Sequence, residues 1–237
     1  MRWASSELSD RVMCHISITI YDNKSRVIPT PLVSQGPYKF KVCDCVRGEI
    51  SPLLANIVLN QLDWQLNHAG LRFVRYADDF VVLCQTQAQA KEALTLVQQV
   101  LEQRLGLQLS REKTKVTSYG KGYAFLGFSL SSRSRRMRPK SVKKFKDKIR
   151  GLTCRKHNLD ASRIEELNRV IRGTAQYFAT RFFTGREVFH KLDSWIRMRL
   201  RCMKTKRKNT NDNKKIRNKV FDRLGLLTLE SFCVQRP

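Results

Sequence analysis

Two adjacent carboxylates, Asp78 and Asp79, lie between two short apolar runs that are typical of strands. The runs cover residues 71–76 and 80–84, so the pair is expected at the tip of a hairpin. A divalent cation would offset the repulsion between the two like charges. Mg²⁺ prefers oxygen ligands and binds through one or two carboxylates together with substrate phosphates. The alternative interpretation is an ordinary Asp-rich turn that needs no metal.

The positive charge of the 237-residue chain is concentrated in its C-terminal part. The formal net charge is +26, of which residues 1–132 carry +4 and residues 133–237 carry +22. This excess favours a nucleic-acid partner, because each Lys or Arg that meets a phosphate releases a counterion.

Neither a membrane partner nor secretion is expected. No apolar run approaches the roughly 18 residues of a membrane-spanning helix, and the N-terminus lacks a secretory pattern. The seven scattered cysteines are typical of reduced thiols. These features predict a cytoplasmic or organellar protein.

The elements around the two carboxylates are predicted to form an α+β domain. A helical apolar stripe precedes the hairpin and consists of Leu53, Leu54, Ile57, Val58 and Leu62. A second stripe follows it, ends at Gly106, and consists of Ala90, Leu94, Val97, Leu101 and Leu105. Residues 116–119 and 123–130 are expected to pair as a closing hairpin around residues 120–122. Residues 15–21 alternate like a strand.

Beyond residue 133 the pattern predicts helices and no strands. Helices are expected over residues 141–152, from a cap at Asp160 or Ser162 to Phe178, and over residues 188–200. Their apolar positions suit a small bundle with basic outer faces, and its aromatic residues are expected mostly in the core. Residues 204–219 are expected to form a basic loop or tail.

Several short blocks resemble the reverse transcriptases and maturases that are encoded by group II introns. Residues 76–80 (Tyr-Ala-Asp-Asp-Phe) resemble the Tyr-Ala-Asp-Asp box of retroelement polymerases. The blocks on either side of that box follow in the family's order at residues 50–57, 109–114 and 125–128. Two further blocks resemble the maturase-specific thumb domain, at residues 172–178 and 192–197.

This resemblance implies how the chain is divided. Residues 47–132 would form a partial right-hand polymerase palm, and residues 133–237 an all-α thumb or maturase domain with a basic C-terminal tail. Residues 1–46 have no assignment.

The resemblance also implies roles for individual residues. Asp78 would be a direct Mg²⁺ ligand, and Asp79 its acidic neighbour at the same catalytic site. Lys113 would lie near the incoming triphosphate, although a solvated lysine is the plain alternative. Tyr76 would shape the turn near the primer end. Gly127 would belong to a hairpin that steadies the primer, unless it is only a strand bulge.

In the basic half, the resemblance implies contacts with the folded intron RNA. Arginine suits this role because its guanidinium forks onto phosphates and stacks on unpaired bases. The predicted nucleic-acid contacts are Arg133, Arg135, Arg136, Arg138, Lys140, Lys143, Lys144, Arg197, Arg201, Lys204, Lys206, Arg207 and Lys208.

The sequence departs from the family pattern upstream of residue 51. Residues 45–48 are Cys-Val-Arg-Gly where the family has Pro-Gln-Gly-Gly. The family's third catalytic Asp is not found, because Asp22 lies in surroundings that do not fit. Since two metal ions need separate carboxylate sources, we expect polymerase activity to be impaired.

Three functions remain open at this point. The chain would be a truncated reverse transcriptase/maturase, a splicing factor that keeps the palm as a scaffold, or a non-enzymatic RNA-binding remnant. Intron RNA is the expected partner. A DNA primer or target, and a second chain that supplies the missing fingers and palm residues, are further partners that the resemblance admits.

Overall fold

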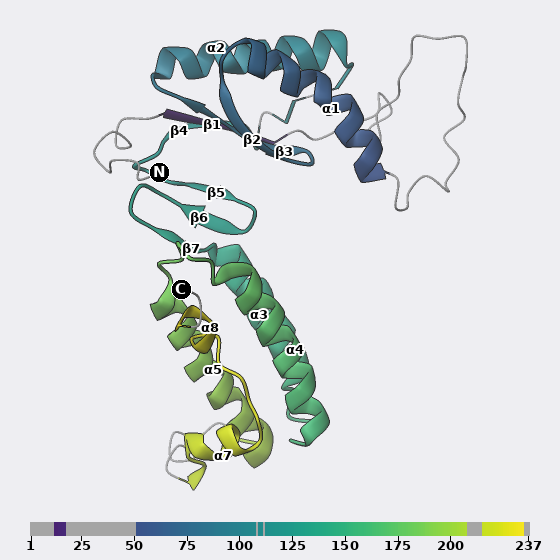
Figure 1. Ribbon diagram of the computed structural model, residues 1–237. Coiled ribbons are helices and arrows are strands. Elements are labelled where there is room, and N and C mark those ends of the chain that lie inside the picture. Colours follow the sequence, from purple (N-terminus) through teal and green to yellow (C-terminus); the bar gives the residue numbers. More distant parts are fainter. Residues whose placement is uncertain (1–11, 18–50, 108, 111, 208–214, 235–237) are drawn as a thin grey trace. The chain divides into compact units, whose positions relative to one another are not determined.

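The structure is a computed structural model that describes residues 12–17, 51–107, 109–110, 112–207 and 215–234 (Figure 1). The chain forms two compact units, Met1–Tyr123 and Ala124–Pro237. The division lies upstream of the predicted boundary between residues 132 and 133. It lies there because strand β5 (Tyr123–Phe125) and the next two strands form a sheet of their own.

The first unit contains a four-stranded antiparallel sheet, ordered β2-β3-β1-β4. Its strands are β1 (Val12–Ser17), β2 (Arg72–Tyr76), β3 (Asp79–Cys84) and β4 (Lys115–Ser118). The strands predicted on either side of the Asp78-Asp79 pair are confirmed. The predicted strand 15–21 starts earlier, at Val12, and its residues 18–21 lie outside the described part of the chain.

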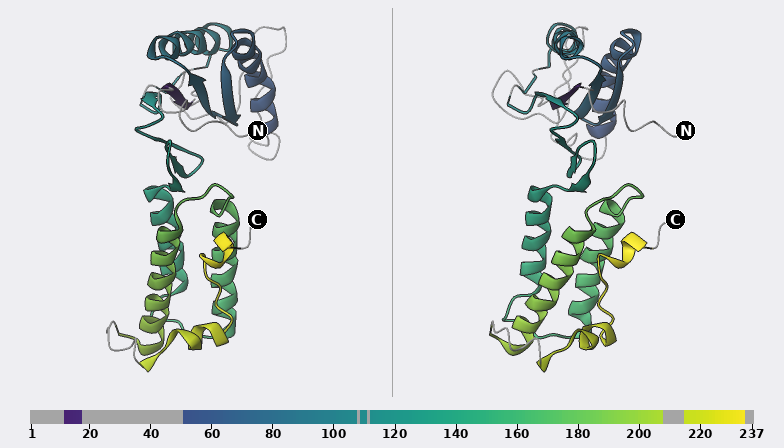
Figure 2. Two further views of the ribbon diagram at one scale, coloured as in Figure 1. Left: turned by 60° about the vertical axis from the view of Figure 1, so that its left-hand side comes forward. Right: turned by 90° about the vertical axis from the view of Figure 1, so that its left-hand side faces the viewer.

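Two helices cover one face of this sheet, α1 (Ser51–His68) and α2 (Gln87–Gln98) (Figures 1 and 2). A π-helical turn, Gln99–Arg104, continues α2. Thr86 caps α2, since its side chain accepts a hydrogen bond from the Gln89 amide at 3.1 Å. The core between helices and sheet includes Leu59, Leu62, Leu66, Phe80, Val82, Ala90, Val97 and Leu101.

The predicted apolar face of α1 was wrong over its first turns. Leu53 and Ile57 are each 60% exposed, whereas Leu59, Leu62 and Leu66 are fully buried. Helix α1 carries apolar side chains on more than one face, so helical spacing alone does not select the face that packs. Contact with the sheet makes that selection.

The predicted closing hairpin between residues 116–119 and 123–130 was also wrong. Strand β4 pairs with β1, with Val12 opposite Ser118 and His15 opposite Lys115. The run 123–130 instead bends on itself at Leu126 and Gly127, which have φ angles of 47° and 79°. This two-residue turn joins β5 to β6 (Phe128–Leu130).

The second unit begins with the three-stranded sheet β5-β6-β7, whose last strand is β7 (Arg135–Met137). We expected no strand beyond residue 133, and β7 corrects that expectation. Strands β6 and β7 are antiparallel, with Phe128 opposite Met137. Three residues are too few to show a period of two in the sequence, so pairing with β6 alone reveals this strand.

Three long helices follow, α3 (Pro139–Leu152), α4 (Ala161–Phe178) and α5 (Arg186–Thr205) (Figure 2). They confirm the predicted helices. Asp160 caps α4, because its side chain accepts a hydrogen bond from the Arg163 amide at 2.9 Å.

The C-terminal segment packs onto these helices and includes α7 (Asn218–Arg223) and α8 (Ser231–Val234). We expected a loop or tail over residues 204–219. Helix α5 nevertheless extends to Thr205, and the buried core of the unit includes Ile216, Phe221, Leu226 and Leu229. None of the helices in the described part of the chain is both long and apolar enough to cross a bilayer.

Candidate nucleic-acid interface

The Asp78-Asp79 pair lies at the tip of the β2–β3 hairpin, as the sequence predicts. Tyr76 pairs with Asp79, so Ala77 and Asp78 form the turn. Ala77 has a φ of 53°, in the left-handed region that favours glycine. Asp78 is exposed and Asp79 is half-buried.

Arg75 connects this turn to helix α1. Its Nε and Nη2 donate to Asp63 Oδ1 at 2.8 Å and Oδ2 at 2.6 Å, a bidentate pair. Its Nη1 donates to Asn56 Oδ1 at 2.8 Å and to the Ala77 carbonyl at 3.1 Å. One guanidinium thereby holds two turns of α1 and the strained residue that precedes Asp78.

The sequence analysis missed Arg75, although one signal for it was present. Alternation along β2 places Arg75 on the same side as Phe73, which packs against the helical core. The side chains of Arg75 and Asp63 are only 12% and 22% exposed. A charged residue at an inward strand position requires a partner, and Asp63 is the inward-facing acid of α1.

The register of the sheet places Lys113 at the same edge as the carboxylates. Strand β1 runs between β3 and β4, with Ser17 opposite Asp79 and His15 opposite Lys115. Lys113 therefore precedes the end of β4 that lies on the Asp78-Asp79 side of the sheet. It is exposed, and its amide donates to the Ser110 carbonyl at 3.2 Å.

The described residues supply only part of a catalytic metal site. No third His, Cys, Asp or Glu joins Asp78 and Asp79 within them. The described part of β1 ends beside Asp79 with Ser17 and contributes no acidic residue. Asp22 lies outside the described residues. Two neighbouring carboxylates fit one hydrated Mg²⁺ but not the pair of ions that needs separate carboxylate sources.

The other two residues of the predicted polymerase site belong to different units. Tyr76 is 65% exposed beside the Asp78-Asp79 turn. Gly127, in the second unit, is a turn residue rather than a strand bulge. Its carbonyl accepts hydrogen bonds from the Arg138 amide at 2.9 Å and Ser141 Oγ at 3.0 Å.

Most of the predicted nucleic-acid contacts lie on the surface of the second unit. Arg135 is half-buried over the Phe182 ring, at 5.0 Å from its centroid, and Arg197 is half-buried on α5. Lys208 lies outside the described residues. Exposed positions hold Arg133, Arg136, Arg138, Lys140, Lys143, Lys144, Lys204, Lys206 and Arg207.

Two of these predicted contacts hold the unit together. Arg201 is only 9% exposed, and it donates to the Ile216 carbonyl at 2.9 Å and Asn218 Oδ1 at 2.6 Å. Burial, and then the charge of Arg197, lower the pKa of Arg201. Lys206 Nζ donates to the carbonyl of His157 at 2.7 Å.

Asp193, on α5, is a buried carboxyl that the sequence analysis did not single out. It is 4% exposed and accepts hydrogen bonds from the amides of Leu229 at 2.9 Å and Glu230 at 3.1 Å. Burial raises its pKa, while these two hydrogen bonds oppose the increase. Its two oxygens fix the C-terminal segment on α5.

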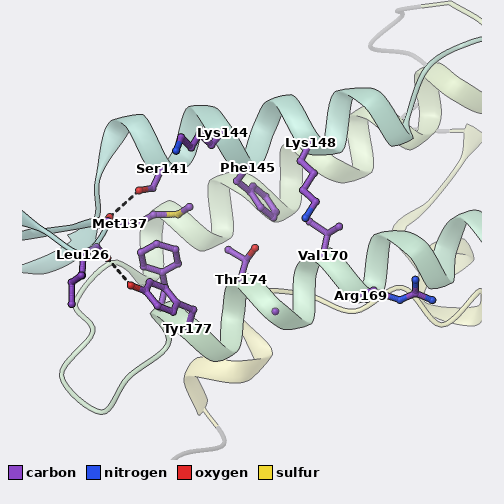
Figure 3. Close-up of a pocket in the computed structure, with 13 residues that line it drawn as sticks. Leu126, Met137, Ser141, Lys144, Phe145, Lys148, Arg169, Val170, Thr174 and Tyr177 are labelled. Atoms are coloured by element: carbon purple, nitrogen blue, oxygen red, sulfur yellow. Dashed lines mark hydrogen bonds between the residues drawn. The ribbon is translucent and has the colours of Figure 1, made fainter. Parts of the chain in front are cut away.

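A groove of about 600 Å³ lies between α3 and α4, and we call it the α3–α4 groove (Figure 3). The β5–β6 turn closes one end of it. Its walls combine cations with apolar and small residues, and Arg169 among them was not singled out from the sequence. The lining residues that matter below are Lys144, Lys148, Arg169, Gly173, Tyr177 and Phe178.

Comparison with known protein families matches both units. Residues 41–130 match the model of the reverse transcriptase (RNA-dependent DNA polymerase), and residues 142–221 match that of the group II intron maturase-specific domain.

Two individual proteins are also similar to parts of the chain. Protein YkfC of Escherichia coli (strain K12) is 32% identical across 35% of this chain and 31% of its own length. A structure of the foamy viral protease-reverse transcriptase in complex with double-stranded DNA has 19% identity and a TM-score of 0.40. That match covers 74% of this chain and 30% of the viral chain. This chain thus spans about a third of the length of each of these proteins.

Proposed function

Because this chain belongs to the reverse transcriptases and maturases that are encoded by group II introns, we propose that it binds group II intron RNA and assists its splicing. The observation that carries this proposal is the maturase-specific match over residues 142–221, which falls in the part of the chain with a net charge of +22. In this role the RNA supplies the reacting groups. The protein supplies positive charge and a rigid surface that stabilises the folded RNA.

The second unit has the architecture that such a role requires. Its apolar side chains face a single core, and the cations of α3 and α5 remain largely outside that core. Internal ion pairs neutralise few of the described cations, with Arg150 pairing with Asp147 and Arg163 with Glu166. The remaining positive surface favours a polyanion with closely spaced phosphates.

The first unit supports a weaker proposal. In a bound complex Asp78 would be a direct ligand of Mg²⁺, with Asp79 as its acidic neighbour and Lys113 close to a triphosphate. Tyr76, and Gly127 in the second unit, would lie near a DNA primer. Since only one carboxylate pair is present in the described residues, we propose that this unit now serves mainly as a scaffold beside the RNA-binding unit.

RNA binding tests the maturase proposal. The full chain is mixed with a group II intron RNA, or with an unrelated RNA of equal length, over a series of salt concentrations. We expect tighter binding of the intron RNA and faster splicing of that RNA when protein is added. A steep salt dependence without any preference for the intron would instead identify a non-specific RNA-binding remnant.

A further inference from the structure

The α3–α4 groove is lined by positive charge, and Glu166, which lines the adjoining pocket together with Lys148 and Arg169, pairs with Arg163. Lys144, Lys148 and Arg169 line it, and no Asp or Glu does. None of these three cations has a hydrogen-bond or ion-pair partner among the residues that the structure describes. Lys144 and Lys148 are also four residues apart on α3, a spacing at which like charges destabilise a helix. An anion in the groove would compensate for that cost.

Tyr177 provides a rigid aromatic surface at the end of the groove that the β5–β6 turn closes (Figure 3). Its hydroxyl donates to the Leu126 carbonyl at 2.8 Å. Its ring contacts Phe178 edge-on at 4.8 Å between centroids and Phe128 at 5.7 Å. These contacts fix the ring in place while Tyr177 remains 51% exposed. We had expected the aromatic residues of this unit mostly in the core, but Tyr177 lies beside the buried stripe of α4 that ends at Phe178.

Gly173 opens the wall of the groove in the middle of α4. Glycine destabilises a helix interior relative to alanine, so a glycine at this position is unfavourable for the helix itself. Close packing does not explain the glycine, because a Cβ at this position would meet nothing within 4 Å. Arg169, Gly173 and Tyr177 recur at intervals of four and therefore follow one face of α4. The gap at Gly173 thus lies between a cation and an aromatic ring.

These three features fit a single kind of ligand. We propose that the α3–α4 groove binds one unpaired nucleotide of a structured RNA. Its phosphate lies against Lys144 and Lys148 of α3, and its base passes over Gly173 to stack on the exposed side of Tyr177. A paired base is already stacked within its helix and offers no free face to the tyrosine. The site rests on the proposed RNA-binding function and defines which structural feature of the RNA is recognised.

The test compares two RNA hairpins that are unrelated to any intron and differ only by one uridine. One carries a single bulged 2-aminopurine, and the other pairs that base with uracil. We expect the full chain to bind the bulged hairpin about tenfold more tightly, with quenching of the 2-aminopurine fluorescence, because stacking on an aromatic side chain contributes free energy of this order.

Two variants and one matched control locate the effect. Gly173→Leu, which fills the groove, and Tyr177→Leu, which removes the ring, should each abolish the preference for the bulge. Lys143→Ala removes a charge from α3 outside the groove, so it should weaken binding to both hairpins equally and leave the preference intact. Circular dichroism verifies that each variant is folded.

Two results would overturn the proposal. One is equal binding of both hairpins by the unmodified chain, and the other is an undiminished preference in folded Gly173→Leu. Because the probe contains no intron sequence, these results are independent of the intron-specific binding that tests the maturase function.

Discussion

Arg75 joins strand β2 to helix α1 and to the turn before Asp78 through its hydrogen bonds. The side chain belongs to β2, its acidic partner Asp63 belongs to α1, and the Ala77 carbonyl that it also binds belongs to the turn. Without side-chain contacts, the polar Ala77-Asp78 turn between β2 and β3 could adopt several conformations. The guanidinium restricts that freedom, so it determines how rigidly Asp78 is presented.

Loss of Arg75 should therefore loosen the turn as well as the α1–β2 contact. We expect Arg75→Ala to lower the free energy of unfolding by about 2 kcal/mol, because Asp63 would lose its partner in a partly buried position. Amide hydrogen exchange in the β2–β3 hairpin should increase. Arg75→Lys keeps the charge without the bidentate geometry. Its free energy of unfolding should lie between those of the unmodified chain and Arg75→Ala. Exchange in the hairpin that stays at the original rate in Arg75→Ala would contradict the assigned role.

Asp193 makes the stability of the second unit depend on pH in a defined direction. Burial raises its pKa above the ordinary value of 3.8, so the folded state holds the proton more firmly than the unfolded state. The stability that this proton contributes is present below the ordinary pKa. It is lost as the pH rises through the raised pKa of the folded state.

Asp193→Asn removes this titration and isolates its contribution. Between about pH 4 and pH 7, the stability of the unmodified chain relative to the variant should fall as the pH rises. Chemical unfolding of both proteins at several pH values measures this difference. A difference that is constant with pH, or that increases, would show that the carboxyl is not destabilised by burial.

At the scale of the element, Gly127 and Gly173 differ in whether the structure can accept a side chain at their position. Gly173 lies inside α4 with open space at its Cβ position. Gly127 has a φ of 79°, and a Cβ there would lie 3.1 Å from Ser141 Oγ. The first position accepts a side chain and the second resists one.

The same substitution should therefore have opposite effects on stability. Gly173→Ala should raise the free energy of unfolding by about 0.5–1 kcal/mol, because alanine favours the helix. Gly127→Ala should lower it by about 1 kcal/mol or more, because the turn requires a positive φ. Urea unfolding of both variants measures these two changes in the free energy of unfolding. Destabilisation by Gly173→Ala would mean that the glycine serves the fold itself and is not explained by a ligand in the α3–α4 groove.

At the scale of the whole molecule, the two units differ in what they can do unaided. The second unit has a closed core, and its maturase-specific match spans most of its helices. The first unit has the Asp78-Asp79 hairpin, but the described part of strand β1 ends beside it without an acidic residue. We therefore expect RNA binding by the second unit, whereas the described residues of the first unit supply only one of the carboxylate sources that two metal ions need.

We accordingly expect little DNA synthesis by this chain alone. Extension of a DNA primer on an RNA template should be far slower than that of an intact family member, because one turn cannot hold two ions at a separation of about 4 Å. The experiment includes Asp78→Ala to identify extension that depends on the hairpin. Robust extension that disappears in Asp78→Ala would refute the expectation and point to a complete site.

Local patterns in the sequence predicted those features that short segments encode by themselves. The hairpin around Asp78, the cap at Asp160 and the stop at Gly106 each depend on a few neighbouring residues. The long helices were predicted because their buried residues recur with the helical period. The charge of the C-terminal part followed from composition alone. The strand pairing of β4 was not predicted, because its partner β1 lies about a hundred residues earlier in the chain.

Sequence by itself thus determined the family, the long helices, the two strands on either side of the Asp78-Asp79 pair and the concentration of positive charge in the C-terminal part. Tertiary structure alone decided which face of α1 is buried, that Arg75 holds the turn before Asp78, and that β4 pairs with β1. Periodicity records that a side chain has apolar or polar character. The partner that it meets, or the solvent that it faces, depends on contacts between distant segments, and these form only when the chain folds.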